Sequence, residues 1–123
     1  MANPNIVNVT NIIGNSLSVA VLTSATQLAS NAASSGKVFK INSIVVANID
    51  GTTAADITVN IYSLAALGGT PLAIASTISV PADASLIVTD KTTAFYLLEN
   101  QSIGAIASTT GDLVATISFE EIN

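Results

Sequence analysis

The sequence predicts an all-β fold, an antiparallel β-sandwich of about eight to ten short strands with jelly-roll-like or Ig-like connections. Apolar and polar residues alternate with a period of two in several stretches, as in half-buried antiparallel strands. Turn residues separate these stretches at short intervals, and no segment has the length and pattern of an amphipathic helix. The 123 residues fit a single domain, residues 1–123.

The first third of the chain holds the least regular elements. Residues 1–10, MANPNIVNVT, are either an N-terminal arm ordered by docking or the first strand of the sandwich. A turn is expected at 13–15, and the next strand, SLSVAV, directs three apolar side chains inward: Leu17, Val19 and Val21. Residues 23–37 are rich in Ser, Ala and Thr and hold a short strand around Gln27 and Leu28 before a loop.

The middle of the chain has the strongest pattern. Residues 37–47 form a strand, and Asp50-Gly51 closes the loop that follows it. In ADITVNIYS the inward residues are Ile57, Val59 and Ile61. The outward residues of the same strand are Asp56, Thr58, Asn60 and Tyr62.

The last half continues the alternation. Residues 63–71, SLAALGGTP, form either one helical turn or a loop, and shorter strands are expected at 84–89, 94–98 and 102–108. The strand at 71–80 directs inward Leu72, Ile74, Ile78 and Val80. The strand at 112–120 directs inward Leu113, Ala115, Ile117 and Phe119.

The charge balance restricts the partners. Three basic and eight acidic residues give a net charge of −5, so neither nucleic acid nor an anionic membrane surface is expected to bind. Only 9% of the residues are charged, where about 25% is usual. Such a surface packs against neighbours without burying charges, which favours an assembly subunit.

The sequence offers little for catalysis. It contains no His and no Cys, the commonest general base and thiol nucleophile, and no G-x-S-x-G motif. Glu120 and Glu121 are the only adjacent acidic pair, and neighbours on a strand point to opposite faces. We therefore expect no enzyme activity, no catalytic residues and no cofactor.

Two stretches resemble binding sites, but a structural role explains each of them better. Asn48, Asp50 and Asp56 supply oxygen ligands around Gly51, as in a calcium loop, but they lack the EF-hand spacing, and a turn explains them better. No metal is expected. Tyr62 and Tyr96 are the only tyrosines that could form a glycan platform, and there is no Trp.

Several pieces of the sequence resemble small virion proteins of tailed bacteriophages, especially marine and cyanobacterial ones. They are SSGKVFKINSIVVANIDGTTAADITVNIY, ISVPADASLIV, YLLENQSI and ISFEEIN, which together cover about two thirds of the chain. The stretch LLENQSI departs from the more acidic turn of that group. The resemblance implies a β-rich structural subunit of the virion and carries over no catalytic residues.

Within that family, the resemblance implies a capsid decoration or cement protein that binds the shell and stabilises it. Its partners would be the major capsid protein or other virion proteins, and a homo-oligomer, favoured as a trimer, would suit the role. The virion would be its location after synthesis in the host cytoplasm, because the start has no signal peptide pattern. Alternatives are a tail, neck or fibre component and a glycan-binding adhesin-type module. The sequence does not identify the binding interface.

Overall fold

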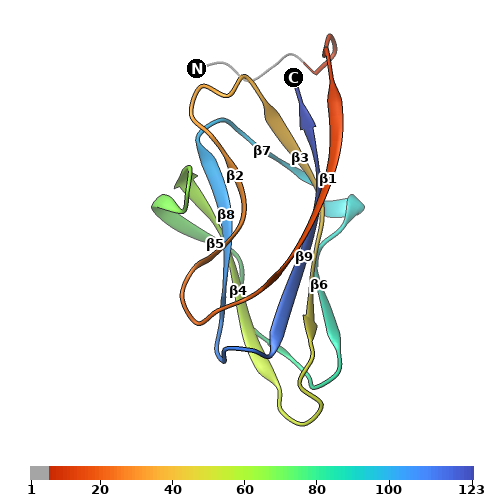
Figure 1. The fold of residues 1–123 in the computed structure, drawn as a ribbon, viewed down its shortest axis with the longest axis vertical. Helices are drawn as coiled ribbons and strands as arrows, with labels where there is room; N and C mark the ends of the chain where they lie inside the picture. The colour runs from red at the N-terminus through yellow and green to blue at the C-terminus, as the bar shows by residue number, and fades with distance from the viewer. Residues whose placement is uncertain (1–5) are drawn as a thin grey trace.

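The computed structural model describes residues 6–123, and its ribbon is drawn in Figure 1. These residues form nine strands and one short 3₁₀ helix, which confirms the all-β prediction. In chain order the elements are β1 (Ile12–Ala20), β2 (Thr26–Asn31), β3 (Val38–Asn48), β4 (Ala55–Leu64), β5 (Gly68–Val80), β6 (Ser85–Thr89), η1 (Lys91–Thr93), β7 (Phe95–Leu97), β8 (Gln101–Ala107) and β9 (Leu113–Ile122).

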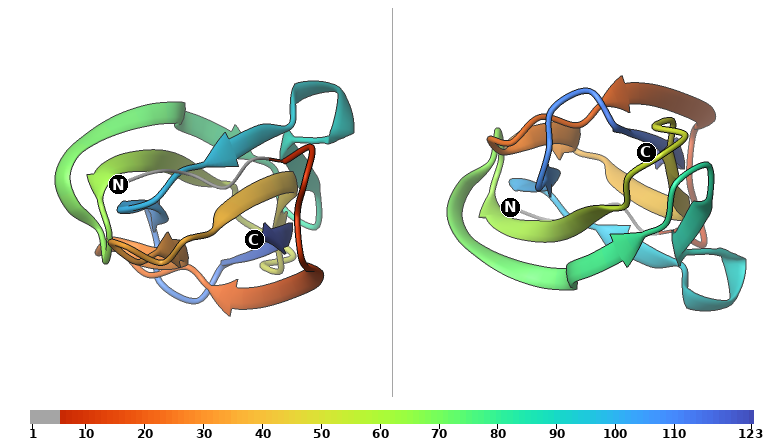
Figure 2. Two further views of the ribbon diagram at one scale, coloured as in Figure 1. Left: turned by 90° about the horizontal axis from the view of Figure 1, so that it is seen from above. Right: turned by 90° about the horizontal axis from the view of Figure 1, so that it is seen from below.

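Two antiparallel sheets make up the sandwich, and Figure 2 shows them as two layers. One sheet has the order β1-β9-β3-β6, with β7 also pairing with β3, and the other has the order β2-β8-β4-β5. The first strand thus lies beside the last, β2 beside β8, β3 beside β6 and β4 beside β5. This nested pairing is the jelly-roll topology, so the structure selects it over the Ig-like alternative.

The core lies between the two sheets, and the strands in the middle of each sheet supply most of it. Ile57 and Val59 of β4 are fully buried, and so are Leu113, Ala115 and Ile117 of β9, all as predicted. Phe119 packs against Phe39 with ring centroids 5.2 Å apart. The alternation predicted the inward face correctly in β9, and in β4 as far as Val59.

Beyond Val59 the burial in β4 departs from the prediction. Ile61 packs against the core but is only half-buried, whereas Asn60 and Tyr62, which were predicted to face outward, are buried. The turn between β4 and β5 explains the burial of Tyr62, because it folds back against the outer face of its own sheet. The register between β4 and β5 also shifts at three places along the pair.

The burial predicted for β1 and β5 is largely wrong, although Leu17 shares the inward face of its sheet with Ile117. Val80 and Val21 are fully buried as predicted, and Val19 packs partly against the core. The other predicted inward residues are exposed: Leu17, Leu72, Ile74 and Ile78. Both strands lie at the rim of a sheet, where one flank of each side chain has no neighbouring strand.

Three local predictions near the chain start and the β4–β5 turn are also settled. The strand around Gln27 and Leu28 is confirmed as β2, whereas the turn expected at 13–15 lies inside β1. Residues 63–71 belong mostly to β4 and β5, and residues 65–67 form the hairpin turn between them, with positive φ at Ala66 and Leu67. Residues 1–5 of the predicted arm or first strand lie outside the described residues. Residues 6–11 contain no strand, and the backbone N–H groups of Thr10 and Asn11 donate to the Asn123 carbonyl.

Candidate interaction surface

The loop after β3 is closed by its own hydrogen bonds. The buried Asn48 side chain donates from Nδ2 to the Thr53 carbonyl at 3.0 Å and to the Val80 carbonyl at 2.9 Å. Asp50 Oδ1 accepts from both the backbone N–H and the hydroxyl of Thr52, each at 2.9 Å. These bonds to Thr52 lower the pKa of Asp50 below 3.8. The loop is therefore a satisfied turn, and among residues 6–123 no group of three or more acidic side chains is placed to hold a metal ion.

The adjacent pair Glu120 and Glu121 diverges, as strand geometry predicts. Glu121 bonds to Asn15 and Lys37, whereas Glu120 lines a separate hollow of about 330 Å³. The other residues around that hollow are Lys40, Asn42, Lys91 and Ala94. The two carboxylates cannot act on one bond from these positions.

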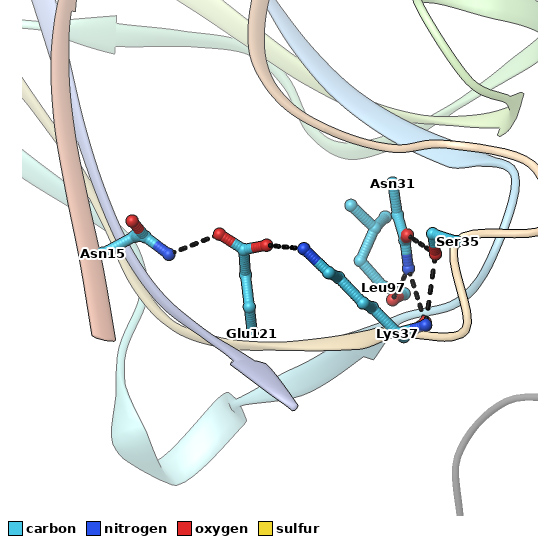
Figure 3. Close-up of polar contacts among 6 residues, drawn as sticks. All are labelled: Asn15, Asn31, Ser35, Lys37, Leu97 and Glu121. Carbon is cyan, nitrogen blue, oxygen red and sulfur yellow. Dashed lines mark hydrogen bonds and ion pairs between the residues drawn. The ribbon is translucent and has the colours of Figure 1, made fainter. Parts of the chain in front are cut away.

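Figure 3 shows how Glu121 of β9 connects β1 to the chain before β3. Asn15 Nδ2 donates to Glu121 Oε2 at 2.6 Å, and Lys37 Nζ lies 3.0 Å from Glu121 Oε1. Both charged side chains are partly exposed, so this ion pair stabilises the fold only weakly. The ion pair joins β9 to the chain before β3, and the hydrogen bond from Asn15 joins β9 to β1.

The second group of contacts in Figure 3 centres on Asn31, which is fully buried at the end of β2. Its Nδ2 donates to the Lys37 carbonyl at 2.9 Å and to the Leu97 carbonyl at 3.2 Å. Ser35 donates its hydroxyl to Asn31 Oδ1 and accepts from the Lys37 backbone N–H. One amide side chain thus fastens the loop at 32–37 between β2, β3 and β7.

The two tyrosines have different environments. Tyr62 is buried against Gly104 beneath the β4–β5 turn, so it cannot serve as the exposed glycan platform considered above. Leu67 of that turn also lies against Gly104, and its backbone N–H donates to the Ser102 hydroxyl at 2.8 Å. Tyr96, in contrast, is 42% exposed.

More than half of the exposed large apolar side chains among the described residues lie on strands at the edges of the sheets. Along β5 these are Leu72, Ile74 and Ile78. Ile74 also lines a shallow groove of about 280 Å³ between the sheets, with Ile61, Val88, Thr89, Thr93 and Phe95. Along β1 the exposed apolar side chains are Ile12, Ile13 and Leu17. β1 and β5 are edges of different sheets, so these are two separate surfaces. Sequence reasoning missed them because it assigned Leu17, Leu72, Ile74 and Ile78 to the core and Ile13 to a turn.

The described strands at the sheet edges carry no charged residues. None of the three basic and eight acidic residues lies on β1, β2, β5, β6 or β7, the described strands at the sheet rims. All of them lie in loops, in η1 or on β3, β4 and β9. Natural sheets commonly protect their rims with charged side chains, so rims that are apolar and uncharged are candidate binding surfaces. The missed signal was in the sequence, since every residue of 12–31 and of 57–82 is uncharged.

Comparisons with known proteins bear on the fold. No protein-family model matches the sequence, and no curated protein matches it. A chain in the structure of Bacillus endospore appendages, described as a novel family of disulfide-linked pili, has a TM-score of 0.50 and 14% identity. That alignment covers 99% of this chain and 95% of the other. A chain of infectious bursal disease virus, Gx strain, has a TM-score of 0.41 and 12% identity, and the match covers 89% of this chain but 33% of the other.

The first of these likenesses extends over almost the full length of both chains and supports the sandwich fold. At 14% identity it concerns the fold alone. Among the described residues, no helix is long and apolar enough to cross a membrane.

Proposed function

We propose that this chain is a non-enzymatic structural subunit of a tailed-phage particle, with capsid decoration as its role. In this role it binds the outer surface of the shell, contacts the major capsid protein and stabilises the shell. The observation that carries the proposal is the set of exposed apolar side chains on sheet rims that bear no charge. The particle is proposed to be a tailed-phage virion because several pieces of the sequence resemble phage virion proteins.

Adhesion explains why such a surface lacks reactive groups. Burying apolar side chains at a contact contributes about 25 cal/mol per Å² removed from water, and it requires no charge to be desolvated. Capsid symmetry repeats each contact many times, so a modest contact stabilises the whole shell through multivalency. A rigid sandwich presents the same surface in every copy.

The same features argue against catalysis. The Asp50 carboxylate is bonded within its turn, Glu121 is shared between Asn15 and Lys37, and Glu120 lies opposite Lys40 in the β3–β9 register. Such arrangements are typical of structural contacts rather than of paired catalytic carboxylates.

The experiment compares phage particles that carry this chain with particles from which its gene is deleted. Quantitative mass spectrometry of purified virions should find the chain in proportion to the shell subunit. Particles without it should release DNA at a lower temperature. A copy number typical of a tail, neck or fibre component would contradict the decoration role.

A second candidate is a fibre-forming subunit, favoured by the full-length fold likeness to a chain from disulfide-linked pili. This chain has no Cys, so disulfides would not link its own fibres. Electron microscopy of the concentrated, purified chain distinguishes the two candidates. Filaments would favour the fibre role, and their absence at millimolar concentration would remove it.

A further inference from the structure

β1 differs from the other rim strands in the regularity of its ladder. It pairs with β9 over nine consecutive residues, from Ile12 opposite Ile122 to Ala20 opposite Val114, with no shift of register. A regular edge of this kind leaves a row of backbone N–H and C=O groups directed away from the sheet.

Each of the other rims is interrupted. β2 has a register shift at Gln27–Ala29, β6 is five residues long and pairs with a strand shifted at Ile44–Val45, and β7 has only three residues. β5 is longer, but it contains Pro71, three register shifts and a positive φ at Thr77. Proline and bulges are the usual devices that stop a rim from pairing with another chain.

β1 also lacks the protection that side chains can give. It contains no charged residue and no proline, and Ile12, Ile13 and Leu17 are 58%, 55% and 46% exposed. In both views of Figure 2, β1 lies on the outer rim of its sheet. No strand of residues 6–123 pairs with this edge of β1, so it is open to a second sheet in that part of the chain.

We propose that β1 pairs with β1 of a second copy of this chain, antiparallel and about a two-fold axis. An unbroken rim forms a continuous ladder only with another unbroken rim, and among the described strands β1 itself is the one that qualifies. Two identical antiparallel strands are related by a two-fold axis, which gives a closed dimer rather than the trimer favoured from the resemblance. The inference rests on the assembly role proposed above, but its test needs only the purified chain.

The expected contact is small but sufficient for a dimer. Nine residues at about 3.4 Å each make an edge about 30 Å long, and a two-layer sandwich is about 20 Å thick at its side. About 600 Å² per partner would be buried, at the lower end of specific interfaces, so the dimer should dissociate on dilution. Each copy carries a net charge of −5, so added salt should strengthen the dimer by screening repulsion.

The test of this dimer substitutes Ser16. It is the central residue of β1, is exposed, and lies opposite Ser118 of β9. In the proposed dimer the two Ser16 residues lie close to the two-fold axis, so Ser16→Lys places two like charges side by side. Ser76→Lys is the matched control, because Ser76 is an exposed serine on the interrupted rim β5.

The experiment measures mass by light scattering and native mass spectrometry over a range of concentrations, with circular dichroism to confirm folding. Wild type and Ser76→Lys should reach twice the 12.4 kDa chain mass at high concentration, and Ser16→Lys should remain at 12.4 kDa. An equimolar mixture of Ser16→Lys and Ser16→Glu chains should recover the dimer, because opposite charges then meet at the axis.

Three results would overturn the inference: a monomeric wild type at millimolar concentration, a trimer, or a dimer that Ser76→Lys disrupts and Ser16→Lys does not. If Ser16→Lys fails to fold, Ser16→Glu alone must give the monomer, and a Ser16→Glu dimer also contradicts the proposal. A monomeric wild type that still binds shells would contradict the dimer but support the decoration role. A dimer that does not bind shells would support the dimer but contradict the decoration role.

Discussion

Leu17 of β1 lies directly opposite Ile117 of β9 in the antiparallel ladder, yet Ile117 is fully buried and Leu17 is 46% exposed. The two side chains share one face of the sheet. Ile117 has β3 on its other side, whereas Leu17 has no further strand beyond it. The exposed flank of Leu17 is part of the apolar rim that we propose as an assembly contact.

This difference predicts unequal effects of the same truncation. Ile117→Ala should lower the free energy of unfolding by about 2–5 kcal/mol, because it leaves a cavity in the core. Leu17→Ala should lower it by less than about 1 kcal/mol in the dilute monomer, since much of that side chain already contacts water. Urea unfolding measures both. Equal losses would contradict the view of β1 as an open rim.

Asn31 should contribute more to stability than the Lys37–Glu121 ion pair. Asn31→Ala leaves the Lys37 and Leu97 carbonyls without their buried donor, so a loss of about 2–3 kcal/mol is expected. Lys37→Met should cost less than about 1 kcal/mol, because both charges are partly exposed. Asn11→Ala, at an exposed position, is the control and should be nearly neutral. A larger loss of unfolding free energy from Lys37→Met than from Asn31→Ala would contradict this prediction.

Gly104 is predicted to be required by the turn that covers it. A Cβ at this position would lie 2.7 Å from Leu67 Cδ2 and 3.1 Å from Tyr62 Cε1. Gly104→Ala should therefore destabilise the fold by about 1–2 kcal/mol. Leu67→Ala in the same chain should relieve part of that loss, which a double-mutant cycle measures.

The control for this cycle is Gly14→Ala in β1, where a Cβ meets nothing within 4 Å. It should leave the stability unchanged or slightly raised, since alanine restricts the unfolded chain more than glycine does. Absence of coupling between Gly104→Ala and Leu67→Ala would mean that the turn does not pack as described.

Acid should destabilise the fold through two aspartates. Hydrogen bonds from Thr52 lower the pKa of Asp50, and hydrogen bonds from Thr92 lower the pKa of Asp90, both below 3.8. A lowered pKa in the folded state means that the stabilisation is complete above the unfolded value and is lost as pH falls through the folded value. The melting temperature should therefore fall below about pH 4.

The variant that tests this is Asp50→Asn with Asp90→Asn. It should show a shallower decrease in melting temperature between about pH 4 and pH 2 than wild type, because two of the carboxylates that take up protons are gone. Identical pH profiles for the variant and wild type would show that these turns do not contribute to acid sensitivity.

The sequence predicted the central strands well and the rim strands poorly, for a physical reason. In β9 the alternation of Leu113, Ala115 and Ile117 gave the buried face correctly, because neighbouring strands flank this strand on both sides. The same alternation in β5 predicted burial of Leu72 and Ile78, which are exposed. Period two identifies one face of a strand, but it does not say whether that strand lies at the rim of the sheet.

The sequence did not predict the burial of Tyr62, for a different reason. It depends on the β4–β5 turn folding back so that Leu67 and Tyr62 meet Gly104, which is far away in sequence. The turn is held by long-range bonds, such as Ala66 N–H to the Ser30 hydroxyl at 2.9 Å. Local propensity cannot anticipate such contacts, because they exist only after β2 and β8 are in place.

The location of this chain on the assembled particle tests the central proposal most directly. A cryo-electron microscopy map of virions that carry the chain, minus the map of virions of the deletion strain, would reveal where it binds. The adhesion account predicts difference density repeated over the outer surface of the shell, with the rim strands at the contacts. Density confined to the tail or neck, or no density in the particle, would contradict it.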